Sequence, residues 1–137
     1  MAFDVERIDY YTMTVAEQVG DGSRLLSVFA GVGVDLLAFK AVSLAPGGAR
    51  FTLFPRDGSK MTEGARKAGV ELDGPRPALL VKGGEKPGAW ARIYEKLSQA
   101  KVPVREASGL AHINGGYGVI LYLEPEDCER AAAALKR

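Results

Sequence analysis

Apolar residues recur along the chain in two rhythms, one alternating and one helical. The runs Phe3–Ile8 and Tyr10–Val15 alternate apolar and polar side chains, which is typical of half-exposed strands. A glycine-containing loop, Glu17–Gly22, separates them from a stretch with helical spacing. The apolar face of that predicted helix is formed by Leu25, Leu26, Phe29 and Val32.

The remainder of the first half predicts a hairpin and a second helix. Strand-like runs at Leu36–Leu44 and Arg50–Phe54 are joined by an Ala-Pro-Gly-Gly turn at residues 45–48. A helix over Ser59–Ala68 follows, with Ser59 as its expected N-cap and Gly69 as its left-handed C-cap.

A proline- and glycine-rich segment divides the sequence. We expect Val70–Leu72 to form a short strand and Asp73–Pro77 to form a turn between two modules, residues 1–74 and 75–137.

The second half repeats the same order. Ala78–Val81 predicts a buried strand, and the runs Val102–Ala107 and Tyr117–Leu123 predict a hairpin. Between them lies a helix whose apolar face would carry Trp90, Ile93, Tyr94 and Leu97. A last helix begins at Pro125, a residue favoured in the first helical turn.

A single offset of 68 positions relates the two halves without a gap. It places Gly20 on Gly88, and it also aligns a glycine pair, two helix positions and several apolar positions. We interpret this as a duplicated module. The aligned residues are Arg24 with Arg92, Val34 with Val102, Gly47-Gly48 with Gly115-Gly116, Leu53 with Leu121 and Ala65 with Ala133.

Each module has the order strand, helix, strand, strand, helix. This order predicts an α/β (α+β) fold of two ferredoxin-like modules, each an antiparallel sheet covered by helices. The second module lacks a fourth strand at its end, so we expect the N-terminal strand, residues 3–8, to complete its sheet.

Composition excludes several classes of function. The chain has 18 basic and 17 acidic residues, so it shows no electrostatic footprint for nucleic acid. One cysteine permits neither an internal disulfide nor a cysteine metal cluster. With no membrane-span pattern and no signal-peptide pattern, we expect a soluble cytoplasmic protein with no metal and no cofactor.

The tetrapeptide Glu85-Lys86-Pro87-Gly88, echoed by Glu17-Gln18-Val19-Gly20, follows the first strand of each module. With this motif and module length, the chain resembles the ACT domain, and two in tandem resemble small stand-alone ACT proteins. The resemblance implies a non-catalytic regulatory protein that binds a small ligand, an amino acid, at an interface between modules.

The chemistry of the motif can also be argued from its residues. A glycine after a strand allows a sharp turn and leaves the first helical N–H groups free to hold a carboxylate. The candidate ligand-binding residues are Gln18, Val19, Gly20 and Asp21 in the first loop and Lys86, Pro87, Gly88 and Ala89 in the second. We expect the second loop to lie near the hairpin turn Asn114-Gly115-Gly116. The alternative is that both glycines only permit tight turns.

No catalytic residue is predicted. His112 has no nucleophile placed beside it by a motif, and Cys128 lies within the last helix. Two functions stay open: an amino-acid sensor, or an association module without a ligand that forms a homodimer or joins an enzyme. A small enzyme such as an acylphosphatase is disfavoured, because Arg24 and Arg92 fall within helices rather than in a phosphate loop.

Overall fold

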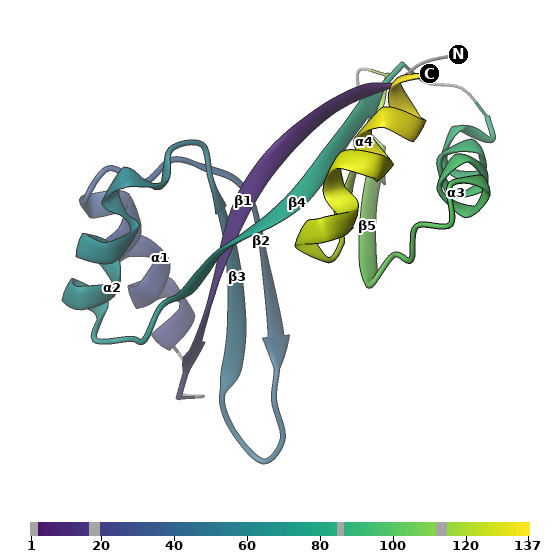
Figure 1. Cartoon of the computed structure of the whole chain (residues 1–137). Coiled ribbons are helices and arrows are strands. Elements are labelled where there is room, and N and C mark those ends of the chain that lie inside the picture. Colours follow the sequence, from purple (N-terminus) through teal and green to yellow (C-terminus); the bar gives the residue numbers. More distant parts are fainter. Residues whose placement is uncertain (1–2, 17–19, 85–86, 112–114) are drawn as a thin grey trace. The chain divides into compact units, whose positions relative to one another are not determined.

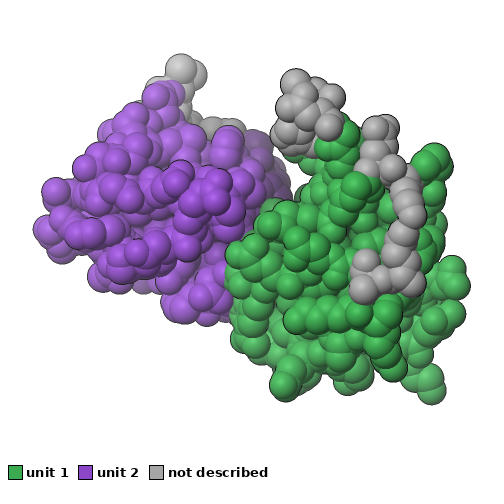
Figure 2. Space-filling model, turned by 90° about the horizontal axis from the view of Figure 1, so that it is seen from above, with its two compact units in different colours: residues 1–8, 77–137 green, residues 9–76 purple. Residues whose placement is uncertain are grey.

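The computed structural model describes residues 3–16, 20–84, 87–111 and 115–137 (Figure 1). The chain divides into two compact units, which Figure 2 shows in different colours. Unit 1 comprises residues 1–8 and 77–137, and unit 2 comprises residues 9–76. Unit 2 therefore carries most of the first repeat, and unit 1 carries the second repeat together with the N-terminal residues.

Unit 2 has four strands in the order β2-β3-β1-β4, with β1 antiparallel to β3 and β2 antiparallel to β3. The strand β1 begins before this unit and β4 continues beyond it. Its elements are β1 (Asp4–Val15), α1 (Asp21–Gly31), β2 (Leu36–Ser43), β3 (Ala49–Pro55), a 3₁₀ turn (Gly58–Lys60), α2 (Met61–Ala68) and β4 (Asp73–Gly83).

Unit 1 has the equivalent order β5-β6-β4-β1, in which β4 and β5 are each antiparallel to β6. The beginning of β1 takes the place that the beginning of β4 has in unit 2. The remaining elements are α3 (Ala89–Gln99), β5 (Glu106–Ala111), β6 (Tyr117–Tyr122), a 3₁₀ turn (Pro125–Asp127) and α4 (Cys128–Lys136). The predicted fold class, two ferredoxin-like modules of antiparallel strands and helices, is confirmed.

Each unit has its own hydrophobic core, and equivalent positions of the two repeats fill both cores. Leu25 and Phe29 of α1 are at most 1% exposed, as are their counterparts Ile93 and Leu97 of α3. Full burial of such a side chain contributes about 1.5–3 kcal/mol. The helical spacing in the sequence therefore identified two core residues of each of these helices, whereas Leu26 and Val32 of the face predicted for α1 are only partly buried.

The N-terminal residues pack in unit 1. Phe3 belongs to the unit 1 core, and its backbone N–H donates to the carbonyl of Leu135 in α4 at 2.9 Å. Glu6 of β1 forms an ion pair with Lys82 of β4 at 3.6 Å.

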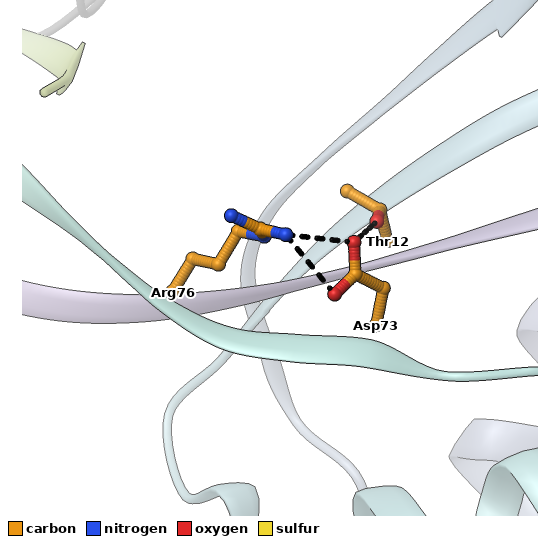
Figure 3. Close-up of polar contacts among 3 residues, drawn as sticks. All are labelled: Thr12, Asp73 and Arg76. Carbon is orange, nitrogen blue, oxygen red and sulfur yellow. Dashed lines mark hydrogen bonds and ion pairs between the residues drawn. The ribbon is translucent and has the colours of Figure 1, made fainter. Parts of the chain in front are cut away.

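The expected turn at Asp73–Pro77 is wrong, because these residues are the beginning of β4. In unit 2 this part of β4 lies at the end of the strand order, where a proline without an N–H is tolerated. Thr12 of β1 donates to the Asp73 carboxylate at 3.5 Å, and Arg76 donates to it at 3.2 and 3.3 Å (Figure 3). The expected strand Val70–Leu72 is also wrong, and Val70 and Leu72 pack as irregular chain against the unit 2 core.

Two further local predictions differ from the structure. Ser59 is not the cap of α2: Asp57 accepts a hydrogen bond from the Ser59 N–H at 3.0 Å and starts a 3₁₀ turn that leads into the helix. Gly69 has φ 74° and ends α2 as expected. The strand predicted at Val102–Ala107 begins only at Glu106, because the Val102 N–H donates to the Leu97 carbonyl at the end of α3.

Within the part of the chain that the structure describes, no helix is long and apolar enough to span a bilayer.

Candidate functional site

The loop before α3 delivers the chain into the helix through a left-handed glycine. Gly88 is the N-cap of α3, with φ 82° and ψ 2°, and the Arg92 N–H donates to its carbonyl at 3.1 Å. The N–H groups of residues 89–91 precede this bond and have no acceptor within the helix. They carry the positive end of the helix dipole and can hold an anion.

The loop before α1 has the same backbone geometry. Gly20 is the N-cap of α1, with φ 99°, and the Arg24 N–H donates to its carbonyl at 2.9 Å. Neither Asp21 nor Ser23 caps this helix with its side chain. The two N-cap glycines thus share the left-handed backbone conformation.

A pocket of about 350 Å³ opens at the start of α3 in unit 1. It joins the loop Pro87–Gly88 to the turn before β6, as the topology of the module led us to expect. Its described lining comprises Pro87, Gly88, Ala89, Trp90 and Ala91 from the α3 side, Ala111 at the end of β5, and Gly116 and Tyr117 at the start of β6. The volume lies at the lower end of the range usual for small-molecule sites, about 300–1,000 Å³.

Two aromatic rings form the walls of this pocket. Trp90 and Tyr117 meet edge to face, with ring centroids 6.3 Å apart and an interplanar angle of 89°. The sequence pattern placed Trp90 and Tyr94 on the apolar face of the helix, but they are 44% and 49% exposed. Only Ile93 and Leu97 of that predicted face are buried, so Trp90 is free to line the pocket instead.

Two glycines make room for these rings. A Cβ on Gly109 of β5 would lie 3.2 Å from Cζ2 of Trp90, and a Cβ on Gly83 of β4 would lie 2.7 Å from Cζ of Tyr117. The positions of both rings therefore depend on neighbouring residues without side chains.

Burial raises the pKa of Tyr117, and the nearby Arg92 opposes this shift by lowering the pKa. The Tyr117 phenol therefore stays protonated at neutral pH and is able to donate a hydrogen bond. Among the described residues that line the pocket, none carries a charged side chain.

The corresponding start of α1 in unit 2 has different neighbours. Gly22 of α1 corresponds to Trp90, and a Cβ on Gly22 would lie 2.9 Å from Cζ of Phe51. The Phe51 ring of β3 therefore packs directly on the first turn of α1. Although Gly20 and Gly88 have the same left-handed conformation, the first turns of α1 and α3 have different side chains around them.

A second hollow, of about 430 Å³, adjoins the hairpin of unit 1, and its walls are mainly glycine and apolar residues. Tyr117 and Gly116 line it as well as the first pocket. Its other described lining residues are Leu80, Lys82, Gly83, Leu110, Gly115 and Gly118.

The remaining predicted site residues can now be placed. Gly20, Asp21, Pro87, Gly88 and Ala89 lie where each repeat turns into its first helix. Gln18, Val19 and Lys86 lie outside the described residues, as do His112 and Asn114.

Sequence reasoning missed Tyr117 and Ala111 as pocket residues. The one sequence signal for them was that they flank the hairpin turn that contains Gly115-Gly116. We expected this turn to lie near the loop that precedes the helix, so the strand residues on either side of it should lie there too.

Cys128 is buried, its thiol donates to the carbonyl of Glu124 at 3.7 Å, and burial raises its pKa. A buried thiol with a raised pKa is not an activated nucleophile. Among the described residues, no group of three or more His, Cys, Asp or Glu side chains is placed to hold a metal ion.

The sequence matches no protein-family model and no curated protein. Solved structures are nevertheless similar in fold. A protein from Bacteroides thetaiotaomicron is 16% identical with a TM-score of 0.82, over 96% of this chain and 88% of that one.

Two further similar structures are named for aspartate kinase. The regulatory subunit of aspartate kinase from Thermus thermophilus, in its ligand-free form, is 13% identical with a TM-score of 0.66, over 98% of this chain and 95% of that one. A chain assigned as a C-terminal regulatory domain of aspartate kinase from Porphyromonas gingivalis is 20% identical with a TM-score of 0.62, over 97% and 94%. At these identities the similarity shows the fold alone, and it agrees with the α+β fold class expected from the sequence.

Proposed function

We propose that this chain is a stand-alone, non-catalytic regulatory protein with two ACT modules in tandem, and that it binds an amino acid at the start of α3. The observation that carries the proposal is the pocket of about 350 Å³ in which Gly88, helical N–H groups that have no acceptor within α3, and two aromatic rings converge. The fold-level similarity to regulatory parts of aspartate kinase supports a regulatory role.

The α-carboxylate of the ligand would accept hydrogen bonds from the N–H groups of Gly88 and Ala89. Such dipole capture contributes about 0.3–2 kcal/mol. The ligand ammonium would be held by residues of another module or of a second copy of the chain. This places the complete site at an interface between ACT modules and couples ligand binding to association.

Of the two predicted loops, we favour the second as the binding loop. Pro87 restricts the backbone before the glycine and reduces the ordering cost on binding. The first loop, Gln18–Asp21, is the weaker candidate because the Phe51 ring packs on the helix that it precedes.

The test is a thermal-shift screen against the common amino acids, followed by calorimetry on a matched pair of variants, Gly88→Val and Gly20→Val. A ligand at 100 times its dissociation constant stabilises the protein by about 2.7 kcal/mol. Both glycines have positive φ, and an added Cβ meets no atom within 4 Å at either one, so the two valines impose similar backbone strain.

We expect Gly88→Val to abolish binding of the ligand found in the screen and Gly20→Val to retain it. Binding by Gly88→Val as tight as that of the parent protein would refute the assignment of the site. If no amino acid shifts the unfolding temperature of the parent protein, the sensor function itself is wrong.

The second candidate function is association without a ligand, and the exposed apolar residues of the edge strands favour it. Phe39 and Val42 on β2 are 55% and 45% exposed, and Leu110 on β5 is 76% exposed. Each of these strands ends the strand order of its unit, and open edges invite pairing with another chain. A homodimer that forms without any response to amino acids would favour this function.

A further inference from the structure

If the proposed function holds, the residues that line the α3 pocket also indicate which class of amino acid it accepts. From those walls we infer that the pocket selects an amino acid with a large apolar side chain, which packs against the rings of Trp90 and Tyr117. Three features of the structure support this selectivity: the lining of the pocket, the charges around it and the exposure of Trp90.

The described lining presents mainly carbon atoms to a ligand side chain. Pro87, Ala89, Ala91 and Ala111 contribute short apolar groups, and the two aromatic rings contribute extended faces. Each additional methylene that a ligand buries against such walls strengthens binding by about fourfold. A larger apolar side chain therefore binds more tightly than the methyl group of alanine, up to the size of the pocket.

Charged ligand side chains find no opposite charge on the described walls. Arg92 is the cation that acts on Tyr117, but its guanidinium lies over the ring of Phe3, with Cζ 5.6 Å from the ring centroid. Lys96 lies over the same ring at 5.7 Å. On these described walls, an acidic or basic ligand side chain would lose its hydration without gaining a charged partner, which disfavours its binding.

Exposing the apolar ring of Trp90 to water costs free energy, and an apolar ligand that covers the ring removes this cost. Trp90 is 44% exposed even though the apolar face of α3 has buried positions at Ala89, Ile93 and Leu97. An apolar ligand covers ring surface that water covers in the free protein. Trp90 is also the only tryptophan of the chain, so its fluorescence reports directly on occupancy of this pocket.

The experiment titrates the parent protein with phenylalanine, leucine, alanine, lysine and glutamate, and follows calorimetry and Trp90 fluorescence in parallel. We expect phenylalanine or leucine to bind about tenfold or more tightly than alanine, lysine and glutamate. We expect the preferred amino acid to shift or quench the Trp90 emission when it binds. The dissociation constant from fluorescence should equal the one from calorimetry.

A second experiment adds a negative charge to the pocket wall with Ala111→Asp and uses Ser43→Asp as the matched control. Ala111 lies opposite Tyr117 in the register of β5 and β6, and Ser43 lies opposite Ala49 at the equivalent position of β2 and β3. We expect Ala111→Asp to weaken leucine binding about tenfold or more. The preference of the pocket for leucine over lysine should therefore become smaller or reverse. Ser43→Asp should leave both affinities unchanged. Ala91→Glu, at an exposed lining position in the first turn of α3, should act in the same direction and serves if Ala111→Asp does not fold.

The outcomes separate the two proposals. Preferred binding of lysine or glutamate by the parent protein would overturn the apolar selectivity but leave the sensor function standing. Binding of an apolar amino acid that changes neither Trp90 emission nor its affinity in Ala111→Asp would overturn this pocket as the place of the side chain. Absence of binding by every amino acid would remove the proposed function, and this inference with it.

Discussion

Gly64 and Gly31 are both helical glycines, yet their surroundings predict opposite effects of alanine. A Cβ on Gly64 of α2 would lie 2.5 Å from Cδ1 and 2.6 Å from Cε1 of Phe29, a core residue of unit 2. A Cβ on Gly31, the last residue of α1, would meet no atom within 4 Å. At the residue scale, the close packing of α1 on α2 therefore depends on the absence of one methyl group.

We expect Gly64→Ala to lower the free energy of unfolding by about 1–3 kcal/mol, because overpacking outweighs the gain in helix propensity. Gly31→Ala should raise it by about 0.4–1 kcal/mol, since it restricts the unfolded chain without strain. Urea denaturation of the two variants beside the parent protein measures both effects. Equal changes of the same sign would contradict the role of the Gly64–Phe29 contact.

At the scale of elements, the two repeats use the same parts at the same offset. Helices α1 and α3 are each 11 residues long, and their first residues, Asp21 and Ala89, lie 68 positions apart. Strands β1 and β4 contribute residues to both units, so the two modules are connected by strands as well as by sequence. The N-terminal part of β1 belongs to unit 1 although it is remote in sequence from the rest of that unit.

Phe3 anchors this element, and its removal should destabilise unit 1. The ring is 8% exposed in the core and has two cations, Arg92 and Lys96, within 5.7 Å of its centroid. We expect Phe3→Ala to lower the free energy of unfolding by about 3–5 kcal/mol. Phe3→Leu should cost about 1–2 kcal/mol, because it keeps most of the apolar contact but loses two cation–π contacts of about 0.5–1 kcal/mol each.

Urea denaturation followed by Trp90 fluorescence, a probe within unit 1, measures the loss. The exposed neighbour Asp4 provides the control, since Asp4→Ala should change the stability by less than about 0.5 kcal/mol. If Phe3→Ala were as mild as Asp4→Ala, the N-terminal strand would not be part of the unit 1 fold.

At the scale of the whole molecule, both repeats expose an apolar residue at the same position of an edge strand. Val42 of β2 and Leu110 of β5 lie 68 positions apart and are 45% and 76% exposed. An equivalent apolar residue on both edges is a costly feature for a monomer, because such edges are prone to pair with other chains. We therefore expect the chain to form a homodimer.

Light scattering at micromolar concentration should give about twice the chain mass of 14.6 kDa. Lysines at both positions, Val42→Lys with Leu110→Lys, should give a monomer, because edge lysines oppose pairing. Ser98→Lys, at an exposed position of α3, adds a charge away from both edges and should leave the mass unchanged. A monomeric parent protein would contradict the prediction.

What the sequence by itself determined about this protein is the order of most of its elements, their equivalence across an offset of 68, and two buried positions on each of α1 and α3. These features are local: the spacing of Leu25 and Phe29 and the left-handed cap at Gly69 depend on residues within a few turns of each other. The ferredoxin-like fold follows from that order, because few topologies accommodate two βαββα modules. The loop glycines Gly20 and Gly88 were likewise identified from their places between strand and helix.

Only the tertiary structure decided where strands pair and which apolar residues stay exposed. Asp73–Pro77 has the composition of a turn, but pairing with the distant β1 makes it a strand, and such pairing leaves no local signal. Trp90 has the spacing of a core residue, yet the core of unit 1 is already filled by Ile93 and Leu97, so its ring lines a pocket with Tyr117. Tyr117 is 27 positions away in sequence, and only the folded chain brings the two rings together.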